Sequence, residues 1–318
     1  MENNLVHVEP TVSERFISKV IDECKATSNG QFDVTDGQRK LIQEYFHGID
    51  AALVAAEAKR QAQVLAGSRY ASEVPVTWAN VNLNGLALDA VYYSRLGLSM
   101  QAPNTLHPIP FFNKRSNKYD LNFMLGYRGK GYIAKKFALN PFKNVIFELV
   151  YANDKFEITK KAGFDDDGDK YVFSISNPFD RGEVVGGFGF VQYEDSSMNR
   201  LYTMSLKEIL KRKPKNASVE FWGGEKDVWK NGKKVGTEKV DGWYEEMLLK
   251  TVKRHVYGMI DLDPSKITED FEYVMRREGE NQAMEIQAEI EENAGTIQIE
   301  APEEGEMQVD VEMLEPDF

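Results

Sequence analysis

The stretch LGYRGKGYIAKKF, residues 125–137, places a helical pattern in the middle of a series of short β-rich segments. On a helix that begins near Tyr127, each residue turns by about 100°, so Ile133 and Phe137 lie on one side and are expected to face the core. Lys130 falls near this apolar side, where its long stem would have to carry the ammonium to water. The other side is a basic stripe that contains one aromatic ring: Arg128, Tyr132, Lys135 and Lys136.

Segments rich in β-branched and aromatic residues lie on both sides of this helix, and turn-forming clusters such as NKRSN, DDDGD and NPFDRGE separate them. The segments are TLHPIPFF, KYDLNFMLG, KNVIFELVY, KFEIT, KYVFSIS and GEVVGGFGFVQY. The glycines of the run GEVVGGFGF are interpreted as bulge positions. We therefore predict an α+β fold, an antiparallel β-meander with flanking helices.

Helical spacing of apolar residues predicts the flanking helices. They are expected at residues 12–26, from Thr35 into the sixties, at 78–96, at about 205–213 and at 240–260. Thr35 and Gln38 fit a capping box at the start of the second helix. Gly97 fits the C-cap of the third.

The charge of the chain is unevenly distributed. Residues 269–318 hold 17 acidic and 2 basic residues, whereas residues 1–268 hold 34 acidic and 37 basic ones. Such asymmetry points to a polyanionic partner for the body and to an acidic interaction tail. We expect a loose arm and a short helix over 1–34, a core that binds this polyanion over 35–268, and a disordered acidic tail over 269–318, too poor in apolar residues to fold.

Several classes of function lack their sequence signatures. There is no P-loop, no H-E-x-x-H and no G-x-S-x-G, and the DDDGD cluster at 165–169 has its glycine at the wrong offset for a calcium loop. The single cysteine, Cys24, can form no internal disulfide and fits a reducing compartment. No apolar run is long enough to span a membrane, and the N-terminus lacks the pattern of a secretory signal. We expect a cytoplasmic protein with no cofactor, no metal ion and no catalytic residues.

The basic stripe favours binding of single-stranded nucleic acid, in which cations follow the phosphates and rings meet the base faces. Arg128, Lys130, Lys135 and Lys136 are predicted to contact the DNA backbone, and Tyr132 to stack or pack. Further candidates are Lys114, Arg115, Lys118, Lys207, Lys211, Arg212, Lys250 and Arg254. A solvated helix face is the alternative for the stripe, and internal ion pairing is the alternative for the helix that carries Lys250 and Arg254.

Three groups of residues taken together resemble the RecT family of phage recombinases, the single-strand annealing proteins. They are the G-Y-R-G junction at Gly126–Gly129, VYANDKFEI at 150–158, and a helix with the pattern W…EM-x-x-K-T-x-x-R from Trp243 to Arg254. The segments LGL at 96–98 and IPF at 109–111 fit as well. The resemblance spans roughly residues 40–260.

The resemblance implies a fold similar to the single-strand annealing protein core and an activity that binds single-stranded DNA and pairs complementary strands without ATP. It implies self-assembly into rings or helical filaments, a phage 5′→3′ exonuclease as partner, and action in the bacterial cytoplasm. A host single-strand-binding protein is a further candidate partner. The acidic tail exceeds what the family core needs, so its role does not carry over.

Two other functions stay open from the sequence. One is a Mg²⁺-dependent nuclease or other nucleic-acid enzyme that uses DDDGD or other carboxylates, and the other is a structural phage protein whose basic patches serve assembly. The tail is expected to fold back on the basic groove, to recruit a partner through its LEPDF end, or simply to keep the protein in solution.

Overall fold

The computed structural model describes residues 9–28, 34–65, 72–214, 217, 219–230 and 233–294. Its helices are α1 (Val12–Ala26), α2 (Asp36–Leu65), α3 (Leu83–Leu96), α4 (Tyr127–Phe137), α5 (Leu206–Leu210), α6 (Val219–Trp222), α7 (Tyr244–Gly258) and α8 (Glu269–Ala294). Its strands are β1 (Leu106–Asn113), β2 (Lys118–Leu125), β3 (Phe142–Tyr151), β4 (Lys155–Thr159), β5 (Lys170–Ser174), β6 (Val184–Tyr193), β7 (Arg200–Ser205), β8 (Gly224–Lys230) and β9 (Lys233–Val240). These strands pair antiparallel, which confirms the predicted α+β class.

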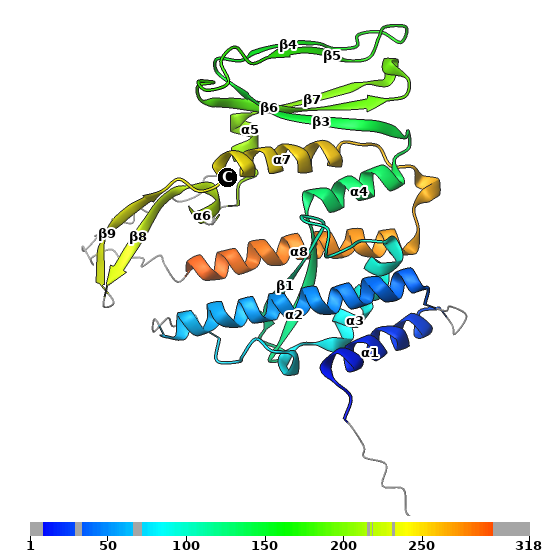
Figure 1. The fold of residues 1–318 in the computed structure, drawn as a ribbon, viewed down its shortest axis with the longest axis vertical. Coiled ribbons are helices and arrows are strands. Elements are labelled where there is room, and N and C mark those ends of the chain that lie inside the picture. The colour runs from blue at the N-terminus through cyan, green and yellow to red at the C-terminus, as the bar shows by residue number, and fades with distance from the viewer. Residues whose placement is uncertain are drawn as a thin grey trace, which may run out of the picture.

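The strands form separate small sheets. The β3-β6-β7 sheet has three strands, and β1-β2, β4-β5 and β8-β9 are two-stranded. Isolated hairpins are marginal in water, so each of them needs a packing partner. In Figure 1 the β4-β5 hairpin covers the outer face of the three-stranded sheet, and the β1-β2 hairpin runs between the helices of the lower half.

The lower half of the molecule in Figure 1 consists of α1, α2, α3, the β1-β2 hairpin and α8 around one core. Phe16, Tyr45, Tyr93 and Phe123 are among its fully buried side chains. The Tyr93 hydroxyl donates a hydrogen bond to the Phe123 carbonyl at 3.0 Å. The polar end of a buried tyrosine is thereby satisfied, as burial of a hydroxyl requires.

The upper half consists of the three-stranded sheet with the β4-β5 hairpin on one face and α7 on the other (Figure 1). The helix presents Leu248, Val252 and Val256, all fully buried, to the sheet. A Cβ on Gly189 of β6 would lie 2.5 Å from a Val256 methyl carbon. This glycine of the GEVVGGFGF run therefore permits a close approach of sheet and helix.

Two helices join the halves. In α4, Ile133 and Phe137 pack into the lower core as predicted, whereas Ala134 packs into the upper core. Helix α8 lies between α4 and α2 in Figure 1 and buries Phe271 and Val274 in the lower core.

The expectation of a flexible tail from residue 269 onward is wrong for α8. Phe271, Val274, Glu278 and Asn281 are at most 5% exposed and recur at helical spacing along one face. The acidic composition concealed this stripe because most of the acids lie on the other faces, Glu278 being one that is buried, and composition averaged over the segment does not register periodicity. Residues 295–318, including LEPDF, lie outside the described residues. In the part of the chain that the structure describes, no helix combines the length and the apolarity that a membrane crossing requires.

Candidate nucleic-acid interface

The G-Y-R-G junction fixes where α4 begins. A Cβ on Gly126 would lie 2.0 Å from the Asn104 carbonyl oxygen, and one on Gly129 would lie 2.2 Å from that of Thr105. Backbone cannot move aside as a side chain can, so these two positions require glycine. The Arg128 amide donates to the Asn104 carbonyl at 3.0 Å, which ties the first turn to the loop before β1.

Two residues of the predicted stripe cap the C-terminus of α3. The Tyr132 hydroxyl and the Lys136 ammonium both donate to the Leu96 carbonyl, at 2.9 and 2.8 Å. Carbonyls in the last turn of a helix lack partners within the helix and attract cations. Tyr132 is still 40% exposed, so its ring faces water while its hydroxyl is engaged.

Two other predicted residues meet at a buried carboxylate of α8. Glu278, 5% exposed, lies 3.3 Å from the Lys130 ammonium and 3.5 Å from the Arg254 guanidinium. It also accepts a hydrogen bond from the Leu125 amide at 3.2 Å. Desolvation and the nearby Arg254 charge lower the pKa of Lys130, and Glu278 opposes that shift. Glu278 thus joins α4, α7 and α8 around one negative charge.

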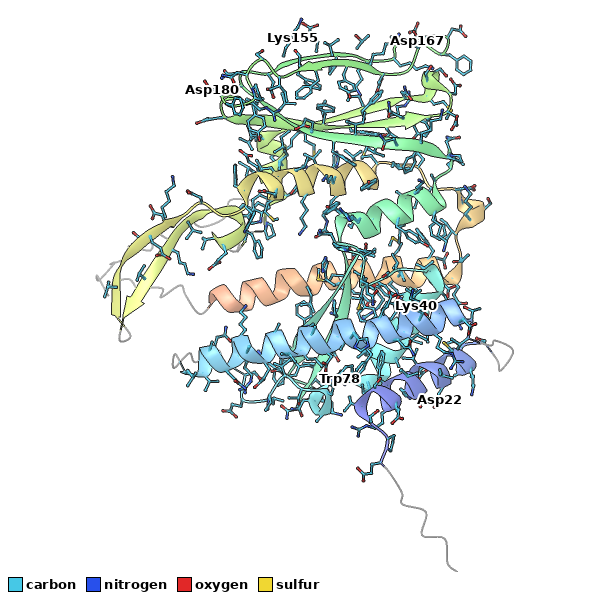
Figure 2. All side chains as sticks on the ribbon, viewed as in Figure 1. Asp22, Lys40, Trp78, Lys155, Asp167 and Asp180 are labelled. Carbon is cyan, nitrogen blue, oxygen red and sulfur yellow. The ribbon has the colours of Figure 1, made fainter. Side chains whose placement is uncertain are left out.

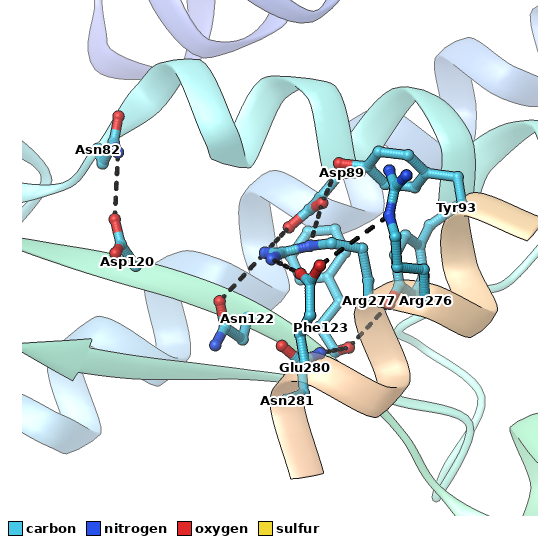
Figure 3. Close-up of polar contacts among 11 residues, drawn as sticks. Asn82, Asp89, Tyr93, Asp120, Asn122, Phe123, Arg276, Arg277, Glu280 and Asn281 are labelled. Atoms are coloured by element: carbon cyan, nitrogen blue, oxygen red, sulfur yellow. Dashed lines mark hydrogen bonds and ion pairs between the residues drawn. The ribbon is translucent and has the colours of Figure 1, made fainter. Parts of the chain in front are cut away.

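Next to Glu278 along α8, Arg277 forms a second ion pair with the buried Asp89 (Figure 3). Asp89 of α3, 1% exposed, accepts hydrogen bonds from Arg277 at 2.8 and 3.0 Å and from the Tyr273 hydroxyl at 2.7 Å. Arg277 also donates to Glu280 at 2.8 Å and to Asn122 at 3.3 Å. This network fixes the rotation of α8 and so aims the next residue, Glu278, at the cations.

The cations of α4 therefore point to different sides. Arg128 and Lys135 are exposed and lie within about 20° of each other around the helix axis, whereas Arg128 and Lys130 lie about 160° apart. Lys136 is exposed as well, but its ammonium is bound to the Leu96 carbonyl, so Arg128 and Lys135 are the exposed pair that we carry forward as the open part of the stripe. Lys130 belongs to the inner cluster around Glu278.

Helix α7 contributes cations beside α4. A Cβ on Gly131 of α4 would lie 2.7 Å from the Tyr257 ring of α7, so the two helices are in contact here. Lys253 of α7, which the sequence analysis did not select, lies over the Tyr127 ring at 4.8 Å. His107 at the start of β1 is close to Lys250, and partial desolvation together with that charge lowers the pKa of His107.

The second-rank candidates lie in separate places. Lys114 and Arg115 follow Asn113 in the β1-β2 turn, which Lys118 closes. That turn is at the far end of β2 from α4, at seven residue steps of about 3.3 Å, or about 23 Å. These three residues do not extend the stripe on α4.

The last basic block is on α5 and just after it. Lys207, Lys211 and Arg212 are exposed, and α5 itself is capped by Ser205 and Glu208. Helix α5 contacts α7. The pKa of His255 on α7 lies below its ordinary value, first because burial desolvates the ring and then because the charge of Arg212 acts on it. The sequence could not show that this block reaches α7, since the contact joins residues far apart in the chain.

The acidic DDDGD cluster has a structural use. Asp169, 4% exposed, accepts hydrogen bonds from the amides of Lys161 and Leu201 at 2.9 and 2.8 Å and pairs with Lys160 at 2.9 Å. Asp167 pairs with Lys170. Among the residues that the structure describes, no group of three or more His, Cys, Asp and Glu side chains is arranged to hold a metal ion.

Comparison with known proteins gives one match. The model of a family described as the RecT family matches residues 74–285 of this chain. The matched region contains β1 to β9, α3 to α7 and the packed part of α8, and so includes Glu278 and both helices that carry the cations. Neither the curated proteins nor the solved structures include a match.

Proposed function

The chain belongs to the RecT family, and on that premise we propose that it anneals complementary single strands without ATP, without sequence preference, and through the cations that α4 and α7 present. Single-strand annealing in DNA recombination and binding of single-stranded DNA are what the family supports. The observation that carries the finer proposal is the exposed pair Arg128 and Lys135 beside the cations of α7.

The physical problem of annealing is repulsion between two polyanions. Cations that contact phosphates release condensed counterions, and each contact to a single strand contributes about 0.7 to the log–log dependence of affinity on salt. A protein that holds the backbone and leaves base edges open lets a second strand test its pairing. Each correct stacked pair then adds about 1.4 kcal/mol. No covalent bond changes, so this reaction needs no acid, base or nucleotide.

A titration of labelled single-stranded DNA by fluorescence anisotropy tests the proposed surface. Replacing Arg128 and Lys135 together by Ala should weaken binding and reduce the salt slope by about 1.4, the value for two lost phosphate contacts. The matched control is Arg39→Ala with Lys40→Ala, which removes the same two charges from exposed positions on α2. Lys40 is labelled in Figure 2, below α8 in that view. Equal salt slopes for the two double variants would remove the proposed site.

A fluorescence-transfer assay with two complementary labelled strands tests annealing itself. Duplex should form faster with protein and without nucleotide, and both strands should keep their length. Mg²⁺-dependent release of nucleotides would instead favour a nuclease. Failure to bind a single strand of about 40 nucleotides would favour a structural role. Ring or filament formation, an exonuclease partner and action in the bacterial cytoplasm belong to the same proposal.

The acidic segment beyond α8 is proposed to compete with DNA for the cations. Residues 295–318 contain eight acidic and no basic residues. A deletion that starts at 270 would remove Phe271, Val274 and Arg277 from the fold, so the test deletes 295–318 only. Affinity for DNA at low salt should then rise, and unchanged affinity would leave partner recruitment or solubility as the role of this segment.

A further inference from the structure

Four side chains from three elements meet where α4 begins. Tyr127 is the first residue of α4, Phe147 lies on β3, and Lys253 and Tyr257 lie one turn apart on α7. The rings of Phe147 and Tyr257 pack edge to face with centroids 5.2 Å apart. We call these four residues the aromatic seam.

The seam holds a cation over its rings. The Lys253 ammonium lies 4.8 Å from the centroid of Tyr127 and 6.0 Å from that of Phe147. The next residue along α4, Arg128, is exposed. Its charge reaches the seam, because it opposes the effect of burial and of Tyr127, which together raise the pKa of Tyr257. Lys253 thus lies over the Tyr127 ring, and Arg128, the next residue along α4, brings a second cation to the seam.

The surroundings of the seam also favour an anion. The first turn of α4 contains no acidic residue, although an acid is what a helix N-terminus ordinarily attracts. The Tyr257 ring is fixed from behind, since it packs against Gly131 so closely that a Cβ there would meet the ring at 2.7 Å. The partly exposed Tyr127 ring, with Lys253 over it and Arg128 next along the helix, offers an aromatic surface beside positive charge.

We propose that the aromatic seam binds one nucleotide of a single DNA strand, with the base stacked on Tyr127 and the adjoining phosphate between Lys253 and Arg128. This inference rests on the proposed function and adds to the predicted contact Arg128 a base-binding ring, Tyr127, and a second phosphate contact, Lys253, neither of which the sequence pattern indicated. In the free protein the Lys253 ammonium occupies the ring by a cation–π contact. A bound nucleotide supplies a phosphate for the Lys253 ammonium and a base for the Tyr127 ring. The cation–π contact between the two side chains is then replaced by an ion pair and a base stack, which are stronger.

The seam explains how binding can ignore sequence. Every base has a face that stacks on an aromatic ring, whereas discrimination between bases needs hydrogen bonds to their edges. A base held by its face on Tyr127 keeps its pairing edge available to a second strand. The same contact therefore serves both binding and annealing.

Photocrosslinking locates the base directly. A single strand that carries 5-iodouracil at several positions is irradiated with the full-length protein, and the crosslinked peptide is identified by mass spectrometry. A crosslink at Tyr127 is expected. Crosslinks confined to other residues, Tyr132 included, would overturn the seam while leaving DNA binding established.

Substitutions separate stacking from charge. Tyr127→Leu should weaken binding of the single strand at least about fivefold, the lower range for loss of one base–aromatic stack. Tyr127→Phe should bind within about twofold of the wild type because a ring remains. Equal losses for Leu and Phe, or no loss for Leu, would contradict stacking. Near-ultraviolet circular dichroism and thermal unfolding check that both variants fold.

The phosphate contact has its own readout. Lys253→Met keeps the stem of the side chain and removes the charge, so the salt slope should fall by about 0.7. The control is Lys25→Met on α1, an exposed lysine outside α4 and α7, which should leave the slope unchanged. An unchanged slope for Lys253→Met would overturn the phosphate contact. If the wild-type protein itself fails to bind single strands, the proposed function fails, and that outcome is distinct from the others.

Discussion

Glu278→Gln removes a negative charge from between Lys130 and Arg254 and leaves the shape of the side chain almost unchanged. The glutamine keeps a carbonyl oxygen that can accept the hydrogen bond of the Leu125 amide, now made at 3.2 Å. What changes is the charge, because the two cations at 3.3 and 3.5 Å lose their counterion. The variant therefore distinguishes two roles of this charge, which are stabilising the fold and keeping Lys130 and Arg254 from binding DNA.

The structure sets the size of both effects. Breaking a fully buried ion pair costs about 3–5 kcal/mol. The side chains of Lys130 and Arg254 are 25% and 32% exposed, so water hydrates them in part and we expect a loss of about 1–3 kcal/mol of unfolding free energy. The same two cations become available to phosphates, so the salt slope of DNA binding should steepen by as much as about 1.4.

The assay compares two variants of the same helix. Glu280→Gln makes the same change of charge two residues later, at an exposed position that pairs with Arg277 and Arg276. Urea unfolding measures stability, and anisotropy titrations between about 50 and 200 mM salt measure the slope. Glu278→Gln should be less stable than Glu280→Gln, and its affinity for DNA should depend more steeply on salt.

One result would refute this reasoning. If Glu278→Gln loses stability while its slope equals that of Glu280→Gln, Lys130 and Arg254 hold α4 and α7 together and do not contact DNA. Lys130 would then no longer belong to the predicted DNA interface, and α4 would contribute to it through its exposed cations, Arg128 and Lys135 among them.

Three further outcomes follow from the geometry. Asp89→Ala should cost about 3–5 kcal/mol in urea unfolding, because Arg277 and the Tyr273 hydroxyl lose their shared buried carboxylate and Arg277 keeps only the more exposed Glu280. A loss below about 1 kcal/mol would show that α8 is held by its apolar face instead. The pKa of His107 lies below its ordinary value, so on acidification the unfolded chain takes up this proton before the folded one, and the stability of the fold should fall as pH drops below about 6.5. His107→Gln should flatten that part of the plot of melting temperature against pH, and an unchanged plot would contradict the prediction. Gly129→Ala should lower the free energy of unfolding by more than about 2 kcal/mol, since its Cβ would meet backbone at 2.2 Å. The control is Gly258→Ala, where a Cβ meets nothing within 4 Å, and equal melting temperatures for the two variants would show that α4 can shift.

The sequence predicted helix ends correctly where residues within about one turn set them. The helix at 12–26 begins and ends as expected, and Thr35 and Gln38 form the reciprocal hydrogen bonds of the capping box, at 2.9 and 3.3 Å. Gly97 caps α3 with a left-handed backbone, φ 84°. Helix α3 begins at Leu83 and not at 78, because a 3-10 turn occupies Trp78–Asn80. Caps and periodicity depend on neighbours within four residues, so a single sequence contains them.

In α8 the periodic spacing of apolar residues was present in the sequence, but averaging the composition over the segment concealed it. Its buried positions recur every three or four residues, yet the surrounding acids outnumber them. The signal was the spacing of the apolar residues Phe271 and Val274, and a count of charges does not contain it.

The sequence by itself determined that this chain folds as α+β, that α4 turns Ile133 and Phe137 to the core, and that residues 1–268 carry more basic than acidic residues. Only the tertiary structure decided which cations remain open to solvent. Glu278 meets Leu125 across 153 positions of the chain, and Arg277 meets Asp89 across 188. The effect of a charge depends on its distance to the next charge and on the water between them, and folding sets both.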